Sequence, residues 1–447
     1  MGKIQKIQKR SGAIVDFIPE RITNAIYRAA VAVGGRDKST SERLSEQVVQ
    51  ILEQRCPENC IPHIEDIQDI VEKVLIENGH AKVAKAYILY RDEQIRSRRK
   101  KAALESRPSE NIPWSKIYHS LVWSVENKLD TIQLFNERIA KGEYQQIVNA
   151  SESAYEDQIE QTAQLILERI DDIRIVIITG PSSSGKTTST TKIGEHLRKR
   201  GYQLITLNVD HYFFDLSMHP KDEFGDYDFE TPQALDLDLI NQHLKQLIAG
   251  EEIIMPYYDF KTGTRKPNQT PLQIKKNEII LIDSLHGLYG KMTEGIPSEQ
   301  MFKLYLEPLL QMRDEKDEFI RWTDIRLIRR MLRDAAHRAY DPEKTLLHWH
   351  YVRASEMRNI IPYVNTTDAI INSAMPYELA LYSHKMLDQF NQWTEKYKDD
   401  PLREDAYTRA SRVAKVLAQF TPIADESPIP LTSVLREFIG GSVYEQH

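Results

Sequence analysis

The segment IRIVIITGPSSSGKTT, residues 173–188, decides the fold class of this chain. Residues 173–179 are apolar and indicate a buried strand, and a polar stretch compatible with a helix begins at Lys186. A glycine-rich turn, residues 180–185, lies between the two. Its backbone N–H groups and the helix N-terminus can surround phosphates, Lys186 adds a positive charge, and the Thr187 hydroxyl can reach Mg²⁺. The pattern therefore predicts a nucleoside triphosphate site. The residues expected to contact it are Gly180, Ser182, Ser183, Ser184, Gly185, Lys186, Thr187 and Thr188.

The overall composition narrows the class of protein. A chain of 447 residues has room for two or three domains, each with its own core. With 41% hydrophobic and 28% charged residues it is typical of a soluble globular protein. The formal net charge of -7 argues against a general nucleic-acid binder. Because no apolar run is long enough to span a bilayer and no signal peptide is visible, we expect a cytoplasmic protein with no membrane partner.

The two cysteines, Cys56 and Cys60, lie in the short segment CPENC, with no second pair elsewhere. A four-ligand zinc site or a disulfide framework needs more cysteines than this. We therefore expect two ordinary thiols near the start of a helix.

Residue patterns divide the chain into four predicted parts. Residues 1–95 combine a short extended stretch, residues 13–17, with helix-periodic segments. The predicted helices of this part are residues 19–33, 41–54, 64–78 and 81–98. The remaining parts are a linker and helical connector over residues 96–172, an α/β domain over residues 173–380, and a C-terminal helical extension over residues 381–447.

Two further strands are expected in the α/β part. Residues 203–208 lead to Asp210, and residues 278–282 end in Asp283. Short strands that alternate with helices predict a mostly parallel sheet covered by helices on both faces. Ligands bind such sheets at the carboxyl ends of the strands, where the glycine-rich turn, Asp210 and Asp283 would meet.

These residues suit phosphoryl transfer to an alcohol. Lys186 would hold the phosphates, and Thr187 and Asp283 are the expected Mg²⁺ partners. The carboxylate of Asp210 could accept the proton of the acceptor hydroxyl, although an aspartate after a strand can also simply cap a helix or form a turn.

The segment DIRLIRRMLRDAAHR, residues 324–338, is a predicted basic helix. Its arginines could neutralise charge over the phosphates and exclude water. The alternative is a solvated basic face. The arginines concerned are Arg326, Arg329, Arg330, Arg333 and Arg338.

Residues 173–375 resemble the uridine kinases of the uridine kinase and phosphoribulokinase superfamily. The resemblance rests on GPSSSGKTT, VDHYF, YDFETPQALD, PYYDFKTGTR, IILID and TDIRLIRRMLRD, in that order. It implies that Asp210 is the base toward the 5′-hydroxyl, that Glu230 holds the ribose hydroxyls, and that Tyr258 packs on the base. It further implies substrate contacts for Tyr212 and Arg265, and phosphate or substrate contacts for Arg330, Arg333 and Arg338.

Three positions depart from that resemblance. Gly263 stands where many uridine and cytidine kinases have a histidine, Glu230 stands in place of an aspartate, and Tyr340 replaces an arginine. The departures concern recognition of the base and ribose, so the kinase activity is better supported than the identity of the nucleoside. The chain is closer to a bacterial subgroup of nucleoside kinases that ends in a stretch like IPLTSVLREFIGGS, residues 429–442, read here as a helix and a Gly-Gly turn.

Residues 1–95 resemble the ATP-cone, a regulatory nucleotide-binding domain, through KRSGAIVDFIPERI and EDIQDIVEKVLIENGHAKVAKAYILYRDEQ. The resemblance implies a second site for ATP or dATP and regulation through assembly into a homo-oligomer. Ser11 and Ile18 depart from the usual residues and leave the nucleotide preference open. The implied contacts are Lys9, Arg10, Arg21, Lys85, Tyr87 and Arg91.

The sequence thus predicts an ATP- and Mg²⁺-dependent kinase of uridine or cytidine with a nucleotide-sensing N-terminal domain. Two alternatives stay open: a kinase of another small alcohol, such as a sugar phosphate or a purine nucleoside, and a nucleotide-sensing assembly protein without turnover. The presence of Asp210 argues against the second, because a binding protein has little use for a base.

Overall fold

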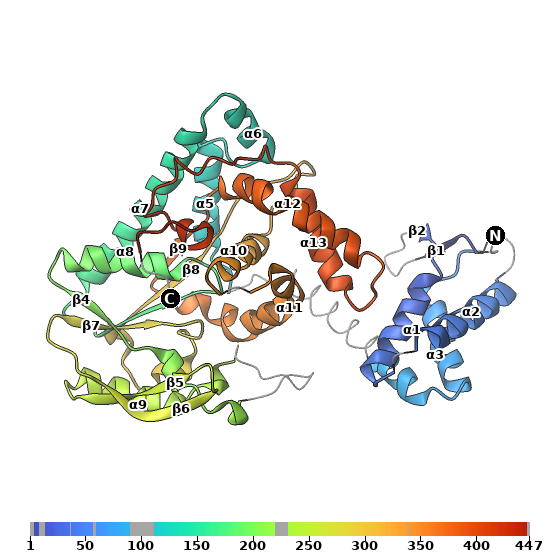
Figure 1. Cartoon of the computed structure of the whole chain (residues 1–447), viewed down its shortest axis with the longest axis horizontal. Coiled ribbons are helices and arrows are strands. Elements are labelled where there is room, and N and C mark those ends of the chain that lie inside the picture. Colours follow the sequence, from blue (N-terminus) through green and yellow to red (C-terminus); the bar gives the residue numbers. More distant parts are fainter. Residues whose placement is uncertain are drawn as a thin grey trace. The chain divides into compact units, whose positions relative to one another are not determined.

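The computed structural model describes residues 4–8, 14–35, 37–56, 60–89, 111–219, 231–338 and 340–444, with only the backbone of residues 337 and 338. The chain forms two compact units (Figure 1). One contains residues 1–109 and 396–404, and the other contains residues 110–395 and 405–447.

The first unit is mainly helical. Strands β1 (Lys6–Gln8) and β2 (Ile14–Asp16) pair in antiparallel fashion. Helices α1 (Glu20–Ala32), α2 (Lys38–Arg55) and α3 (Ile64–Glu77) follow, and residues 81–89 are also helical. The predicted helices of this part are confirmed within the described residues. The second begins three residues earlier than expected, because the side chain of Asp37 accepts a hydrogen bond from Ser39 N and caps the helix.

The cysteine prediction was wrong. Cys56 and Cys60 are joined in a disulfide, with their Cα atoms 5.5 Å apart. The chain leaves α2 at Cys56, and the separation of the two Cα atoms lies within the range at which two cysteines can bond.

The second unit is built on a five-stranded parallel sheet with the order β4-β7-β3-β8-β9. Its strands are β3 (Ile175–Thr179), β4 (Gln203–Thr206), β7 (Glu278–Asp283), β8 (Met301–Glu307) and β9 (Ala369–Asn372). The central strand β3 is buried over its whole length. Ile175 and Ile177 pack in a cluster with residues of α9 (Leu237–Ile248), and Val176 and Ile178 on the opposite face are equally buried. Both faces of the sheet are therefore covered, which confirms the predicted α/β fold class.

Helices surround this sheet and a hairpin extends beside it (Figure 1). The helices are α5 (Trp114–Glu126), α6 (Ile132–Ala140), α7 (Tyr144–Glu168), α8 (Lys186–Arg198), α10 (Trp322–Arg338), α11 (Pro342–Asn359), α12 (Glu378–Tyr397), α13 (Glu404–Leu417) and the short α14 (Arg436–Ile439). The hairpin consists of β5 (Ile253–Asp259) and β6 (Thr264–Leu272), which pair in antiparallel fashion.

Two buried arginines fix helix α10. Arg326 donates two hydrogen bonds to Glu356, at 2.6 and 2.9 Å, and Arg329 donates two to Glu378, at 2.7 and 2.9 Å. Both arginine side chains are fully buried. The hypothesis that the arginines of this segment lie over the phosphates, or form a solvated face, is wrong for these two. Burial in low dielectric demands a paired carboxylate for each, so the pairs fix α10 against α11 and α12.

Replacement of Arg329 by methionine is expected to lower the free energy of unfolding by about 3–5 kcal/mol, because Glu378 is then left buried without its counter-charge. Urea unfolding at pH 7 measures this. Arg321→Met, at the exposed residue before α10, is the matched control and should change stability by less than about 0.5 kcal/mol. An equal loss in both variants would contradict the assignment.

Candidate functional site

The phosphate loop, residues 180–188, follows β3 and opens α8. Gly185 has a φ of 89°, which favours glycine. A Cβ atom at Gly180 would lie 2.2 Å from the backbone oxygen of Leu306, and one at Gly185 would lie 2.5 Å from Cγ2 of Val434. The two glycines are therefore required by close packing as well as by backbone conformation.

Hydroxyl groups of this loop are buried without partners. Among the described residues, nothing forms a hydrogen bond with the Oγ atoms of Ser183 and Ser184. Buried polar groups are normally satisfied, and the first N–H groups of a helix need acceptors as well. Phosphate oxygens would supply acceptors to the hydroxyls and to the start of α8, so the loop fits the group that the sequence predicts.

Lys186 and Asp283 lie together at this loop. The Lys186 Nζ donates to the backbone oxygen of Gly180 at 3.0 Å. Burial lowers the pKa of Lys186, while the charges of Asp283 and Glu437 raise it. Asp283 is held nearby because it ends β7 and pairs in register with Ile178 on β3. The structure thus brings a cation and a strand-end carboxylate to one side of the loop.

Helix α10 supplies two partly exposed arginines. Arg330 approaches the loop, with an NH1 to Ser182 Oγ distance of 3.4 Å. Arg333 donates two hydrogen bonds to Asp334, at 3.0 and 2.9 Å. The buried Asp334 also lies 3.4 Å from Arg330 Nε and so links the two guanidinium groups. The side chain of Arg338 lies outside the described residues.

Asp210 lies in a short 3-10 turn, Val209–Tyr212, that follows β4. Its backbone N–H donates to the side chain of Asn208 at 3.1 Å, and its own side chain is exposed. Because β4 is parallel to the central strands, this turn lies at the carboxyl edge of the same sheet as the phosphate loop.

An aromatic cluster lies next to this turn. Tyr258 stacks on His219 with ring centroids 6.2 Å apart, and the rings of Phe213 and Phe260 contact it at 5.6 and 5.0 Å. Tyr258 is 2% exposed and Phe260 is 61% exposed. The ring of Phe260 is therefore the face of this cluster that a flat ligand could reach without rearrangement.

Two predicted substrate residues have other partners. Tyr212 is fully buried, and its hydroxyl lies 2.7 Å from Nδ1 of His243. Arg265 pairs with Asp236 at 2.8 Å. Both contacts hold the turn and the hairpin in place. Glu230 lies outside the described residues.

The predicted regulatory residues are only partly described. Lys9, Arg10 and Arg91 lie outside the described residues. Arg21, at the start of α1, and Lys85 are exposed, whereas Tyr87 is buried in the core of the first unit. The structure does not by itself bring these residues into one site.

Sequence reasoning missed two residues of the phosphate loop's surroundings. The carboxylate of Glu437, in α14, accepts hydrogen bonds from Thr188 N at 3.2 Å and Thr188 Oγ1 at 3.0 Å. His286, three residues after Asp283, is 5% exposed, and no described group forms a hydrogen bond with either ring nitrogen. Burial and the charge of Lys186 lower the pKa of His286 to about 4. For His286, its position three residues after Asp283 is the one sign in the sequence that it lies near the site.

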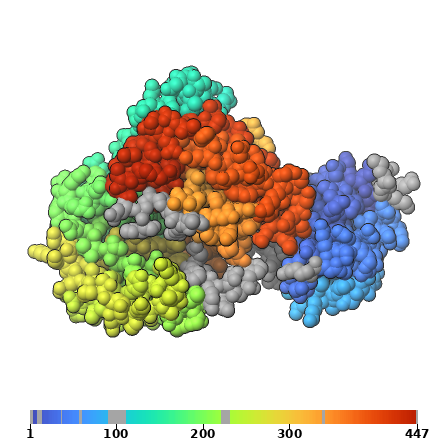
Figure 2. All heavy atoms as spheres, viewed as in Figure 1, coloured from blue at the N-terminus to red at the C-terminus, as the bar shows by residue number. Residues whose placement is uncertain are grey.

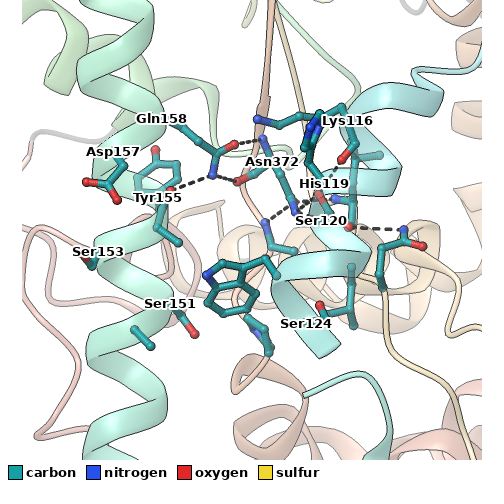
Figure 3. Close-up of a pocket in the computed structure, with 18 of the residues that line it drawn as sticks. Lys116, His119, Ser120, Ser124, Ser151, Ser153, Tyr155, Asp157, Gln158 and Asn372 are labelled. Carbon is teal, nitrogen blue, oxygen red and sulfur yellow. Dashed lines mark hydrogen bonds between the residues drawn. The ribbon is translucent and has the colours of Figure 1, made fainter. Parts of the chain in front are cut away.

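A separate cavity of about 410 Å³ lies between α5 and α7 (Figure 3). Asn372 links Gln158 and Ser120. Its backbone N–H donates to the Gln158 side chain, and its side-chain amide donates to Ser120 Oγ. Tyr155 lines the cavity and its hydroxyl lies 2.6 Å from Ser189 Oγ on α8. The lining contains no residue of the loop from Gly180 to Thr188, so this cavity is distinct from the predicted phosphate site.

The described residues offer neither a metal cluster nor a membrane-spanning helix. They contain no group of three or more His, Cys, Asp or Glu side chains placed to hold a metal ion. Nor does any described helix have both the length and the apolar character needed to cross a bilayer.

The pH dependence of stability should report the burial of His286. Because the pKa of His286 is lowered from 6.5 to about 4 on folding, the unfolded chain takes up the proton at a higher pH than the folded one. The stability that this neutral histidine contributes is therefore complete above pH 6.5 and is lost as the pH falls toward 4. The loss at pH 4 is about 3 kcal/mol. We expect the free energy of unfolding, measured with a chemical denaturant between pH 8 and pH 4, to fall by this amount more in wild type than in His286→Leu. A difference independent of pH would show that the imidazole is not held neutral.

Comparisons with known proteins agree with this geometry. The model of the phosphoribulokinase / uridine kinase family matches residues 175–379, and that of the ATP cone domain matches residues 5–96. A uridine kinase of Bacillus cereus is 31% identical over 200 residues, which cover 44% of this chain and 84% of the relative. One of Chloroflexus aurantiacus is 33% identical over 174 residues, or 38% of this chain and 73% of the relative. A solved structure described as a possible uridine kinase from Bacillus stearothermophilus has 15% identity and a TM-score of 0.31, covering 48% of this chain and 97% of that one.

Proposed function

Because the chain belongs to the phosphoribulokinase / uridine kinase family, we propose that it transfers the γ-phosphate of ATP to the 5′-hydroxyl of uridine or cytidine. The general class is a phosphotransferase that acts on an alcohol group. The observation that supports the proposal most directly is the convergence of Lys186, Asp283 and Arg330 on one glycine-rich loop. That set clamps a polyphosphate and balances its charge.

The loop and α8 would hold ATP through the backbone N–H groups and hydroxyls of residues 180–188, with Lys186 on the outer phosphates. The Thr187 hydroxyl and the Asp283 carboxylate are hard oxygen donors, which suit Mg²⁺. When bound, Mg²⁺ neutralises charge on the phosphates. Few protein ligands are needed, since Mg²⁺ at such sites uses one or two of them together with the nucleotide. Arg330 and Arg333 would stabilise the charge of the transferring group.

The acceptor would lie between Asp210 and the aromatic cluster. We assign Asp210 to accept the proton of the attacking hydroxyl, because its carboxylate is exposed at the carboxyl edge of the sheet. The cluster around Tyr258 and Phe260 supplies flat apolar surface of the kind on which a nucleobase packs.

One observation keeps another small alcohol as a second candidate. Gly263 stands where many uridine and cytidine kinases have a histidine, and it adopts a φ of 66°. A Cβ atom there would lie 2.9 Å from Cβ of Leu216. A larger side chain at this point would therefore be strained, and we infer that base recognition differs from that in kinases with a histidine here.

Turnover with a panel of acceptors decides between the candidates. Uridine, cytidine, purine nucleosides and sugar phosphates are each incubated with ATP, Mg²⁺ and the purified protein, and products are identified by mass. A phosphorylated pyrimidine nucleoside as the best product supports the proposal. Phosphorylation of a sugar phosphate or purine nucleoside alone would replace it with the second candidate.

Asp210→Asn is expected to lower kcat by on the order of 10²–10⁴-fold while the KM for ATP stays near the wild-type value, because only proton transfer is lost. Asp238→Asn, at an exposed position on α9, is the matched control and should leave kcat unchanged. Steady-state kinetics at pH 7 with the best acceptor tests this. Wild-type kcat in Asp210→Asn would remove Asp210 from the role of base.

We further propose that ATP or dATP binds residues 1–95 and regulates the kinase by shifting its assembly. A regulatory ligand acts only if two states of the protein bind it with different affinity. In a Lys186→Met background, which disables the phosphate loop, added dATP should still change the sedimentation coefficient and raise the melting temperature. The added change Arg21→Ala should abolish both effects, whereas Arg43→Ala on α2 should not. No effect of either nucleotide in the Lys186→Met protein would contradict regulation through this unit.

A further inference from the structure

The C-terminal residues of the chain lie against the phosphate loop. Residues 433–439 include the short helix α14, which contacts α10, and the last part of the chain forms some of the outer surface of its unit (Figure 2). Val434 packs on Gly185, and Glu437 accepts hydrogen bonds from both Thr188 N and Thr188 Oγ1. Glu437 is 5% exposed, so the contact is made away from solvent.

The atoms that Glu437 contacts belong to the predicted phosphate site. Thr188 is the third residue of α8, and its N–H is one of the helix-start groups without an intrahelical acceptor. Such N–H groups at the end of a glycine-rich loop are the donors that bind phosphates. The helix dipole favours any anion there, whether carboxylate or phosphate. The carboxylate of Glu437 therefore occupies a position that also suits a phosphate group.

Both anions cannot use this position together. The Thr188 N–H is a single donor, and a carboxylate beside a phosphate repels it strongly where water is excluded. We propose that the carboxylate of Glu437 is a built-in competitor for the phosphates of ATP, holding the start of α8 until the nucleotide displaces it.

The rest of this segment is firmly packed, because Ser433, Val434, Leu435 and Phe438 are at most 1% exposed. Ser433 Oγ donates to Glu152 on α7 at 2.5 Å, and the ring of Phe438 lies over Arg329 at 4.8 Å. Arg436 donates to the backbone oxygens of Glu426 and Ile429, at 2.8 and 3.0 Å, within the same C-terminal segment. The packed residues therefore stay in place, and displacement is a rotation of the Glu437 side chain away from the start of α8.

The inference rests on the proposed binding of ATP by residues 180–188, and it is tested by the KM for ATP. Glu437→Gln keeps the size of the side chain and removes its charge. We expect its KM for ATP to fall about tenfold, since a charge-assisted hydrogen bond that opposes binding is weakened. The melting temperature without nucleotide should fall at the same time, because the start of α8 loses a charged cap. Asp425→Asn removes the same charge from an exposed site that precedes residues 433–439, and it should change neither value.

Other outcomes overturn the inference. An unchanged KM with a lower melting temperature would make Glu437 a structural cap alone. A lower kcat with an unchanged or higher KM would make it part of the catalytic machinery. If Glu437→Gln fails to fold, hydrogen exchange of the wild-type peptide covering residues 429–444 decides instead: addition of AMP-PNP should speed its exchange, and slower exchange would contradict displacement.

The same nucleotide separates this inference from the proposed function. Calorimetric titration with AMP-PNP measures nucleotide binding to wild type and to Lys186→Met. The difference between the two proteins is the binding that depends on the phosphate loop, because any binding by residues 1–95 is common to both. Absence of Lys186-dependent binding would overturn the proposed function itself. Lys186-dependent binding with the same affinity in wild type and Glu437→Gln would overturn only the competition by the C-terminal segment.

Discussion

Close packing around the phosphate loop is the constraint on which the site depends. A backbone oxygen of the neighbouring strand fills the space beside Gly180, and Val434 fills the space beside Gly185. Ser373 Oγ donates to Ser184 O at 2.6 Å, and Arg326 donates to Ser182 O at 3.2 Å. The loop is thus held from β8, α10, the segment after β9 and the C-terminal segment at once. A rigid set of N–H donors costs little reorganisation when an anion arrives, which is what electrostatic catalysis requires.

The arginines of α10 have two kinds of role, structural for the buried ones and chemical for the partly exposed ones. Arg326 and Arg330 are one helical turn apart, and both approach Ser182, one at its backbone oxygen and the other at its hydroxyl. Arg326 is neutralised by Glu356 and cannot serve a ligand, whereas Arg330 remains partly exposed. The buried pairs fix the helix, and the helix then presents Arg330 and Arg333 to the loop.

The sequence predicted the parts of this structure that local patterns encode. The apolar run before Gly180 predicted the central strand, and the alternation of strands and helices predicted the parallel sheet, because burial on both faces leaves a continuous apolar signal. The burial of Arg329 could not be predicted, since its partner Glu378 lies 49 residues further along the chain. Tyr212 was expected at the substrate because its motif is local, yet its hydroxyl pairs with His243, 31 residues away.

The contact between Glu437 and Thr188 also joins residues far apart in the sequence, 249 positions from each other. It could therefore not be predicted from the sequence. The position of Glu437 differs in kind from that of Asp283, the other carboxylate near Lys186. Asp283 is part of β7 and is held by strand register, so it stays whatever binds. Glu437 belongs to the buried four-residue helix α14, but its carboxylate stands at the end of a flexible side chain. Of these two negative charges, one is fixed by the sheet and suits a metal ion, while the other lies on a side chain that can rotate away when phosphates take its place.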